Sequence, residues 1–194
     1  MIAVVRRRAT SMIARGQDYY LALRLRYEPS VAKLVIVAES PPSSGKYFYD
    51  PTGSIKEPLF AALMRQLKAT PATKEVGLRD FQSKGWVLVD ATYHQVDKLP
   101  RDADRDRDAL IEGDYPLLVE DLSSLLSDRG VPLILIKANV CRILEPRLTK
   151  DGFNVINTGR LVYFPSTGQQ KRFEQQFAVV LNSPGRGAGA SSVS

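Results

Sequence analysis

Cysteine and histidine are almost absent: the 194-residue chain has one of each, Cys141 and His94. A single thiol and a single imidazole exclude a disulfide framework, a zinc site built on cysteine and histidine, and a four-cysteine iron–sulfur cluster. No apolar run approaches the roughly 18 residues that span a bilayer, and the apolar start of the chain is too short for a secretory signal. We therefore expect an intracellular protein with no metal, no cofactor and no membrane span.

Acidic residues are the scarcer charge, with 21 aspartates and glutamates against 27 lysines and arginines and a formal net charge of +6. This balance favours an anionic partner such as nucleic acid, and a solvated basic surface is the alternative. Arg6, Arg7, Arg8 and Arg15 all come before the first acid. They predict a phosphate-contacting arm or a solvated chain end, with an organelle transit peptide as a third reading.

Apolar runs of strand length recur at residues 33–38, 86–90, 132–138 and, less regularly, 153–165. Nearly continuous runs are typical of strands covered on both faces, as in a parallel sheet. Segments with the apolar spacing of helices lie at 57–68, 114–130 and 169–181. This βαβα pattern predicts a three-layer α/β/α sandwich with a central, mainly parallel four-stranded sheet.

The segment at 114–130 carries signals for both helix ends. Asp114 is placed to cap the helix, Pro116 lies in its first turn, and Gly130 is placed to end it. The charges at 100–108 alternate in sign, which predicts a solvated loop or the start of a helix.

The length of the chain suits one globular domain. We expect residues 1–30 to form a basic segment and a helix, at about 11–26, packed on the core. Residues 31–182 form the α/β domain, and the composition of 183–194 predicts a flexible tail.

Polar residues follow the predicted strands at the carboxyl edge of the sheet, where open α/β folds bind ligands. They are Glu39, Asp90, Lys137, Asn139 and the segment 164–168. A turn or cap residue is the simpler interpretation of Asp90 and Asn139. Glutamate has little use in turns or caps, so Glu39 favours a functional role.

Two short motifs resemble the signatures of the uracil-DNA glycosylase superfamily. Ala38-Glu39-Ser40-Pro41-Pro42 matches a first motif of the type G-E-A-P-G, and Phe164-Pro165-Ser166 matches a late H-P-S or N-P-S motif. The resemblance extends over residues 31–182. It implies a base-excision repair hydrolase that flips uracil out of DNA and cuts its N-glycosidic bond, leaving an abasic site.

The resemblance also implies roles around the base and the sugar. Glu39 is the catalytic carboxylate, which stabilises the cationic sugar and orients the attacking water. Either Phe48 or Tyr49 stacks on the base, with Tyr47 as a third candidate, and Pro42 crowds the methyl group of thymine. The base-binding candidates are Ser40, Pro42, Phe48, Tyr49, Asp90 and Phe164.

Three features depart from the family pattern. Phe164 replaces a histidine that donates to the departing base, and His94 is a candidate to replace it as a catalytic group, with a surface or structural imidazole as the alternative. Asp90 replaces an asparagine that reads the uracil edge, and a carboxylate repels uracil O4 unless it is protonated. Members with the G-E-A-P-G motif usually bind an iron–sulfur cluster, which one cysteine cannot hold.

The resemblance further implies contacts to the DNA backbone, through hydroxyls, amides and basic side chains. The candidates are Ser43, Ser44, Pro165, Ser166, Thr167, Gln169, Lys171 and Arg172. Gln169 lies near the position where relatives insert a leucine into the duplex, and a polar wedge favours single strands.

We therefore expect a uracil-DNA glycosylase that acts on single- or double-stranded DNA as a monomer, in the cytoplasm at the nucleoid. One alternative is a protein of the same fold that binds DNA or abasic sites with little or no cleavage. The other is an α/β enzyme acting on a nucleotide or a phosphorylated metabolite.

Overall fold

The computed structural model describes residues 16–100 and 103–183, so the arginines at 6–8 and 15 and nearly all of the expected tail lie outside the described residues. Its strands are β1 (Leu34–Ala38), β2 (Trp86–Asp90), β3 (Pro132–Leu135) and β4 (Asn154–Val155). They form one four-stranded sheet in the order β2-β1-β3-β4, and every pair is parallel. The predicted fold class is confirmed.

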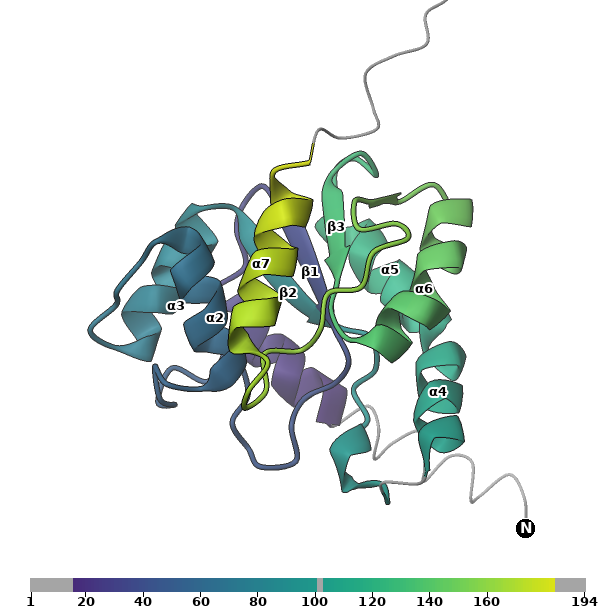
Figure 1. Ribbon diagram of the computed structural model, residues 1–194, viewed down its shortest axis with the longest axis horizontal. Coiled ribbons are helices and arrows are strands. Elements are labelled where there is room, and N and C mark those ends of the chain that lie inside the picture. The colour runs from purple at the N-terminus through teal and green to yellow at the C-terminus, as the bar shows by residue number, and fades with distance from the viewer. Residues whose placement is uncertain (1–15, 101–102, 184–194) are drawn as a thin grey trace, which may run out of the picture.

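Helices cover both faces of this sheet (Figure 1). They are α2 (Pro58–Leu67), α3 (Lys74–Ser83), α4 (Asp104–Gly113), α5 (Tyr115–Leu125), α6 (Ala138–Lys150) and α7 (Gln170–Leu181), with a short 3-10 helix η1 (Val96–Lys98) and a helix at residues 16–25. α2, α3 and α7 lie on one side of the sheet, and α5 and α6 lie on the other (Figure 1). No helix in the described ranges is long and apolar enough to cross a membrane.

The side chains of β1 point alternately to the two faces of the sheet and so contribute to two separate hydrophobic cores. Leu34 and Ile36 point to a face packed with aromatic side chains from α2, α3 and α7. Val35 and Val37 point to the opposite face, where aliphatic side chains of α5 and α6 predominate. All five residues of β1 are buried, as a central strand of a doubly covered parallel sheet requires.

Two expected strands are shorter than predicted. β3 stops at Leu135, because the chain turns to a different partner two residues later. There the backbone amide of Lys137 donates to the carbonyl of Val162 at 2.7 Å. β4 has only two residues. Beyond it the side chain of Asn157 takes the place of a strand, accepting from Leu135 N–H and donating to Leu135 C=O, both at 3.0 Å.

The helices differ from expectation in number and extent. Helices α3 and α6 fall where no helix was predicted. The segment 100–108 was expected to be a loop or the start of a helix, and α4 does begin within it, at Asp104. α5 ends at Leu125, not at Gly130, and its N-cap residue Asp114 makes no side-chain capping bond. The Asp114 carboxylate instead accepts from the Thr92 hydroxyl at 2.5 Å, which ties α5 to the loop after β2.

Candidate functional site

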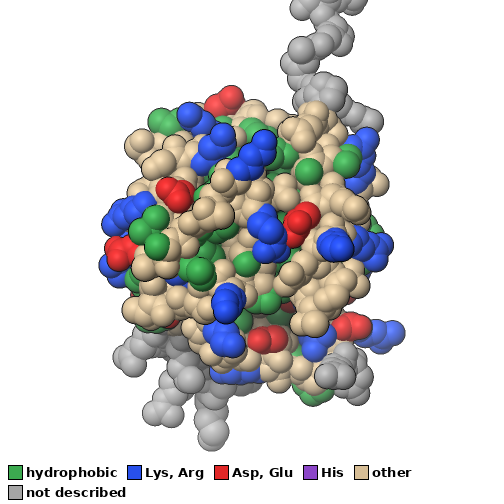
Figure 2. Space-filling model, turned by 60° about the vertical axis from the view of Figure 1, so that its left-hand side comes forward, with side chains coloured by type: hydrophobic (Ala, Val, Ile, Leu, Met, Phe, Trp, Pro, Cys, Tyr) green, Lys and Arg blue, Asp and Glu red, His purple; other side chains and the backbone are tan. Residues whose placement is uncertain are grey.

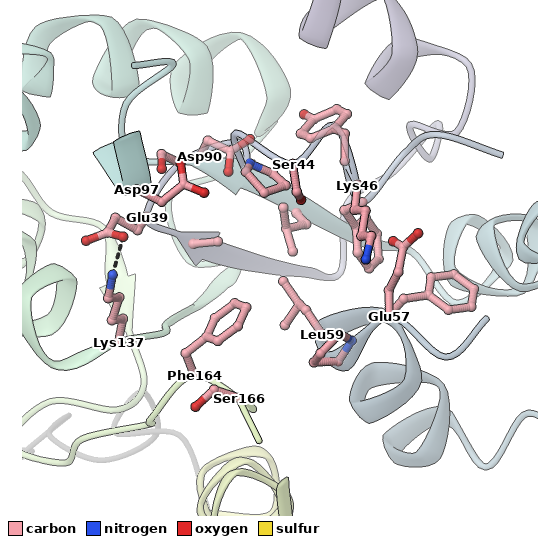
Figure 3. Close-up of a pocket in the computed structure, with 18 residues that line it drawn as sticks. Glu39, Ser44, Lys46, Glu57, Leu59, Asp90, Asp97, Lys137, Phe164 and Ser166 are labelled. Carbon is pink, nitrogen blue, oxygen red and sulfur yellow. Dashed lines mark hydrogen bonds and ion pairs between the residues drawn. The ribbon is translucent and has the colours of Figure 1, made fainter. Parts of the chain in front are cut away.

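A pocket of about 490 Å³ opens at the carboxyl ends of β1 and β2. This volume falls within the roughly 300–1,000 Å³ usual for small-molecule sites. The wall comes from the end of β1, the loop after it, the first turn of α2, the end of β2, and the segment before α7. Figure 3 shows Glu39 and Lys137 pointing toward each other on one side of this pocket, with Leu59 on the opposite side.

Glu39 lies at the mouth of the pocket, between two nitrogen donors. Its Oε2 pairs with the Lys137 ammonium, and its Oε1 accepts from Asn139 Nδ2 at 2.7 Å. The Glu39 carbonyl accepts from the Thr92 amide at 3.1 Å, which fixes the backbone against the loop after β2. The side chain is 11% exposed, so the carboxylate is oriented by its partners and still borders the pocket.

Asp90 is the second acid in the wall, and its surroundings are different. It is paired in register with Ala38 of β1, it is only 4% exposed, and its Oδ2 has no hydrogen-bond partner among the described residues. Burial raises the pKa of this carboxyl to about 7, although the Tyr47 hydroxyl and the Arg24 guanidinium lower it. Near neutral pH, Asp90 can therefore present either a donor or an acceptor to a ligand.

The three aromatics after the first motif separate in the structure. Tyr47 and Phe48 line the pocket. Tyr49 does not, because its hydroxyl accepts from the Leu88 amide at 2.7 Å and donates to the Leu88 carbonyl at 3.1 Å, deep in the core. Phe164 lines the pocket from the segment before α7 and remains 38% exposed. Tyr47, Phe48 and Phe164 are therefore the expected aromatic candidates that border the pocket, and Phe164 is the exposed one.

Ser40 and Pro42 also line the pocket, as expected of base-binding candidates. His94 does not line it. The His94 Nε2 lies 3.8 Å from Asp114 Oδ2, and its backbone amide donates to the Thr92 hydroxyl at 3.1 Å. The structure thus places the only imidazole of the chain beside the start of α5 rather than beside a bound base.

The serines after the first motif face different partners. Ser44 lines the pocket. Ser43 is occupied, since its backbone amide and its hydroxyl both donate to the Asp97 carboxylate, the hydroxyl at 2.8 Å. A phosphate at Ser43 would meet the negative charge of Asp97, so the loop offers Ser44 as its accessible hydroxyl.

The segment before α7 brings only part of its expected set to the pocket. Ser166 lines it, Pro165 is buried, and Thr167 is exposed. Gln169 is the N-cap residue of α7 but makes no side-chain capping bond.

The basic residues of the first turn of α7 are on the surface. Lys171 and Arg172 are both exposed, and the Arg172 guanidinium lies 3.8 Å from the centre of the Tyr163 ring. Figure 2 shows a face of the molecule on which lysines and arginines are interspersed with acidic and apolar side chains. Any electrostatic attraction to DNA on this face is therefore spread over scattered charges.

Sequence reasoning gave no role to several residues that the fold brings to this pocket. Lys137, which lines the pocket, and Asn139, which touches it only through Glu39, stood out only by their place after the third strand, and their common partner Glu39 is about a hundred positions away. Lys46, Leu59 and Asp97 in the wall were not expected at all. A strand-end lysine facing a strand-end glutamate across a parallel sheet is the one signal that could have identified the pair.

In the described ranges, no three cysteine, histidine or acidic side chains cluster closely enough to hold a metal ion. Comparisons with protein-family models, with curated proteins and with solved structures find no match. The chemistry of the site rests on its own groups: a carboxylate held by an ammonium and an amide, a buried carboxyl with an oxygen that has no partner among the described residues, and several aromatic rings. Such a set can hold a planar heterocycle and stabilise positive charge beside it.

Proposed function

We propose that this protein is a DNA glycosylase that flips uracil out of DNA and hydrolyses its N-glycosidic bond. The observation that carries the proposal is the placement of Glu39 at the mouth of an aromatic-lined pocket whose wall contains the buried Asp90 carboxyl. The two motifs that resemble the superfamily contribute residues to the same pocket, namely Glu39, Ser40 and Pro42 from the first and Phe164 and Ser166 from the second.

The charges that develop in this reaction match the groups present. The sugar becomes positive as the bond breaks, and the Glu39 carboxylate stabilises that charge and orients the attacking water. The departing base becomes negative, and it needs donors in place of the missing histidine. A protonated Asp90 and the Ser166 hydroxyl, both in the pocket wall, are the side-chain donors for that role.

The wall also supports the selection of a pyrimidine. Phe164 is the exposed aromatic side chain of the wall and Phe48 a buried one, and stacking of a flipped base on such a ring contributes about 1–3 kcal/mol per base. Pro42 narrows the pocket where the methyl group of thymine would lie.

The experiment is strand scission of labelled single- and double-stranded oligonucleotides that carry one uracil, with alkali added after incubation to cut abasic sites. We expect scission with the native chain and with the control Glu120→Gln, whose side chain is exposed on α5, and loss of scission with Glu39→Gln. Scission that survives in Glu39→Gln, or no preference for uracil over thymine, would overturn the proposal.

One observation favours a second candidate, a protein that binds abasic or uracil-containing DNA with little cleavage. The Lys137 ammonium already neutralises Glu39, which weakens its power to stabilise a cationic sugar. Tight binding to uracil-containing DNA without scission would support this candidate.

A further inference from the structure

Lys137 has a backbone conformation that lysine rarely adopts. Its φ is 87° and its ψ is 140°, and Lys68 is the only other non-glycine residue with a positive φ in the described ranges. A residue with a side chain is strained in this region of conformational space, which is occupied mainly at functional sites. The Lys137 amide is held by the Val162 carbonyl at 2.7 Å. The strained backbone directs the side chain across the sheet edge to Glu39 (Figure 3).

The Glu39–Lys137 pair stands between two hollows. Both residues line the aromatic pocket of about 490 Å³ and also a neighbouring, more open one of about 500 Å³. The second hollow is bordered by Asn139 and by two ion pairs, Arg107 with Asp104 and Arg142 with Asp108, whose acids and arginines all line it. If the base occupies the first pocket, as the proposed function requires, and the strand crosses the second, the sugar C1′ lies at the pair.

The Lys137 amine is therefore close to the atom that becomes an aldehyde once the base has left. Its side chain is 40% exposed, so the nitrogen is accessible to a substrate, and its partner Glu39 is a carboxylate able to accept a proton. Amines attack carbonyl carbons readily when an adjacent base removes that proton.

Resting on the proposed function, we propose that Lys137 attacks the aldehyde of an abasic site and cleaves the DNA strand by β-elimination. Glu39 accepts a proton from the ammonium, and the Nζ lone pair forms a bond to C1′ of the ring-opened sugar. The resulting carbinolamine loses water, with the proton returned by Glu39 to the departing hydroxyl, and leaves a protonated imine between Lys137 and C1′.

The imine acidifies the hydrogens on C2′. Glu39 removes one of them, a C2′–C3′ double bond forms, and the C3′–O bond breaks with its electron pair leaving on the phosphate, which takes the proton from Glu39. The downstream fragment departs with a 5′-phosphate. Water then hydrolyses the imine, which frees Lys137 and leaves an unsaturated aldehyde on the upstream fragment, without any change in oxidation state from an external reagent.

The experiment uses labelled oligonucleotides that contain one preformed abasic site, mixed with the full chain and sodium borohydride, which reduces an imine to a stable amine. We expect a covalent protein–DNA adduct with the native chain and with the control Lys150→Ala, at the exposed far end of α6. Lys137→Ala and Lys137→Arg should lower adduct formation by about tenfold or more. Arginine keeps the charge beside Glu39, so Lys137→Arg tests the amine apart from folding.

Peptide mapping of the adduct should find the modification on Lys137, and a tetrahydrofuran analogue without an aldehyde should give no adduct. An absent adduct, an adduct of full yield in Lys137→Arg, or modification of another residue overturns the proposal. Because the abasic site is preformed, adduct formation does not depend on uracil excision. Excision without an adduct would refute this inference alone, and an adduct without excision would refute only the glycosylase.

Discussion

Glu39 and Asp90 end two neighbouring strands at the same edge of the sheet, yet their carboxyl groups have opposite surroundings. Glu39 is held by an ammonium and an amide at the mouth of the pocket. Asp90 is enclosed, has an oxygen without a partner, and has a pKa raised to about 7 by burial. Two carboxyl groups in one site, placed in different environments, can hold different charges and therefore different roles.

This difference in surroundings determines which of the two acids acts on the sugar and which acts on the base in the proposed reaction. A paired, ionised carboxylate suits the positive sugar, whereas a carboxyl that keeps its proton suits a base that departs with negative charge. The roles cannot be exchanged, because an ionised acid at Asp90 would lie in an apolar pocket and repel the oxygen of uracil.

The largest expected effect comes from removing the charge at the mouth of the pocket. Glu39→Gln should lower the single-turnover rate of uracil excision about 10³-fold, since it removes the charge that stabilises the cationic sugar. Binding of uracil-containing DNA, followed by fluorescence anisotropy, should change little. An equal loss of rate in Asp90→Asn would show that the two acids are not divided in role.

The second largest expected effect is on the free energy of unfolding, and it comes from Asp90 alone. Its folded pKa of about 7 lies above the value of about 4 expected in the unfolded chain. Between these pH values the folded state keeps a proton that the unfolded state releases, so stability falls as pH rises through this window. Relative to Asp90→Asn, the native chain should lose about 4 kcal/mol of unfolding free energy between pH 4 and pH 7, measured by urea unfolding.

Asp50→Asn is the control for this pH dependence, because it should have the opposite sign. The Thr52 side-chain hydrogen bond lowers the pKa of Asp50, so the contribution of Asp50 is present at neutral pH and lost as pH falls. A curve for Asp90→Asn parallel to that of the native chain would contradict the burial of a protonated acid.

A smaller effect should appear in the pH profile of activity. The charged groups facing Asp90 are Arg24 and Asp121, with the Tyr47 hydroxyl nearby. Once Asp90 ionises it no longer donates to uracil, so the excision rate should fall about tenfold for each pH unit above 7. Asp90→Asn, which keeps an N–H donor at all pH values, should show a flat profile from pH 6 to 9. A native rate that rises through pH 7 would mean that the ionised form is the active one.

The same contrast shows what the sequence could predict. Glu39 and Asp90 were identified because each follows a continuous apolar run, and burial of such runs on both faces fixes where the strands end. The roles of the two acids were less accessible. The burial of Asp90 and its unpartnered oxygen depend on side chains from the helix at 16–25 and the loop after β1, such as Arg24 and Tyr47, which no local pattern connects.

Other features of the fold could not be predicted from the sequence either, in one case because a side chain makes the hydrogen bonds that a strand backbone normally makes. Asn157 completes the hydrogen bonding of β3 in place of a longer β4, so the apolar run after 155 does not continue as a strand. Helix α6 contains Pro146, a residue that argues against a helix interior. The positive φ of Lys137 has no sequence signature, since such positions normally carry glycine.

The smallest expected effect tests whether the backbone of Lys137, beside Glu39 at the mouth of the pocket, is strained in a way that the backbone at the buried Asp90 is not. Lys137→Gly and Lys137→Ala both remove the ammonium beside Glu39, but only glycine adopts a φ of 87° without strain. Lys137→Gly should therefore be more stable than Lys137→Ala by about 1 kcal/mol in urea unfolding. Lys68, with a φ of 57° at the end of α2, provides a matched pair, and glycine should exceed alanine there by a similar margin without any effect on uracil excision. If alanine and glycine are equally stable at 137 while they differ at 68, the backbone at Lys137 relaxes when the side chain is removed, and the pull of Glu39 on the ammonium is what holds the strained conformation.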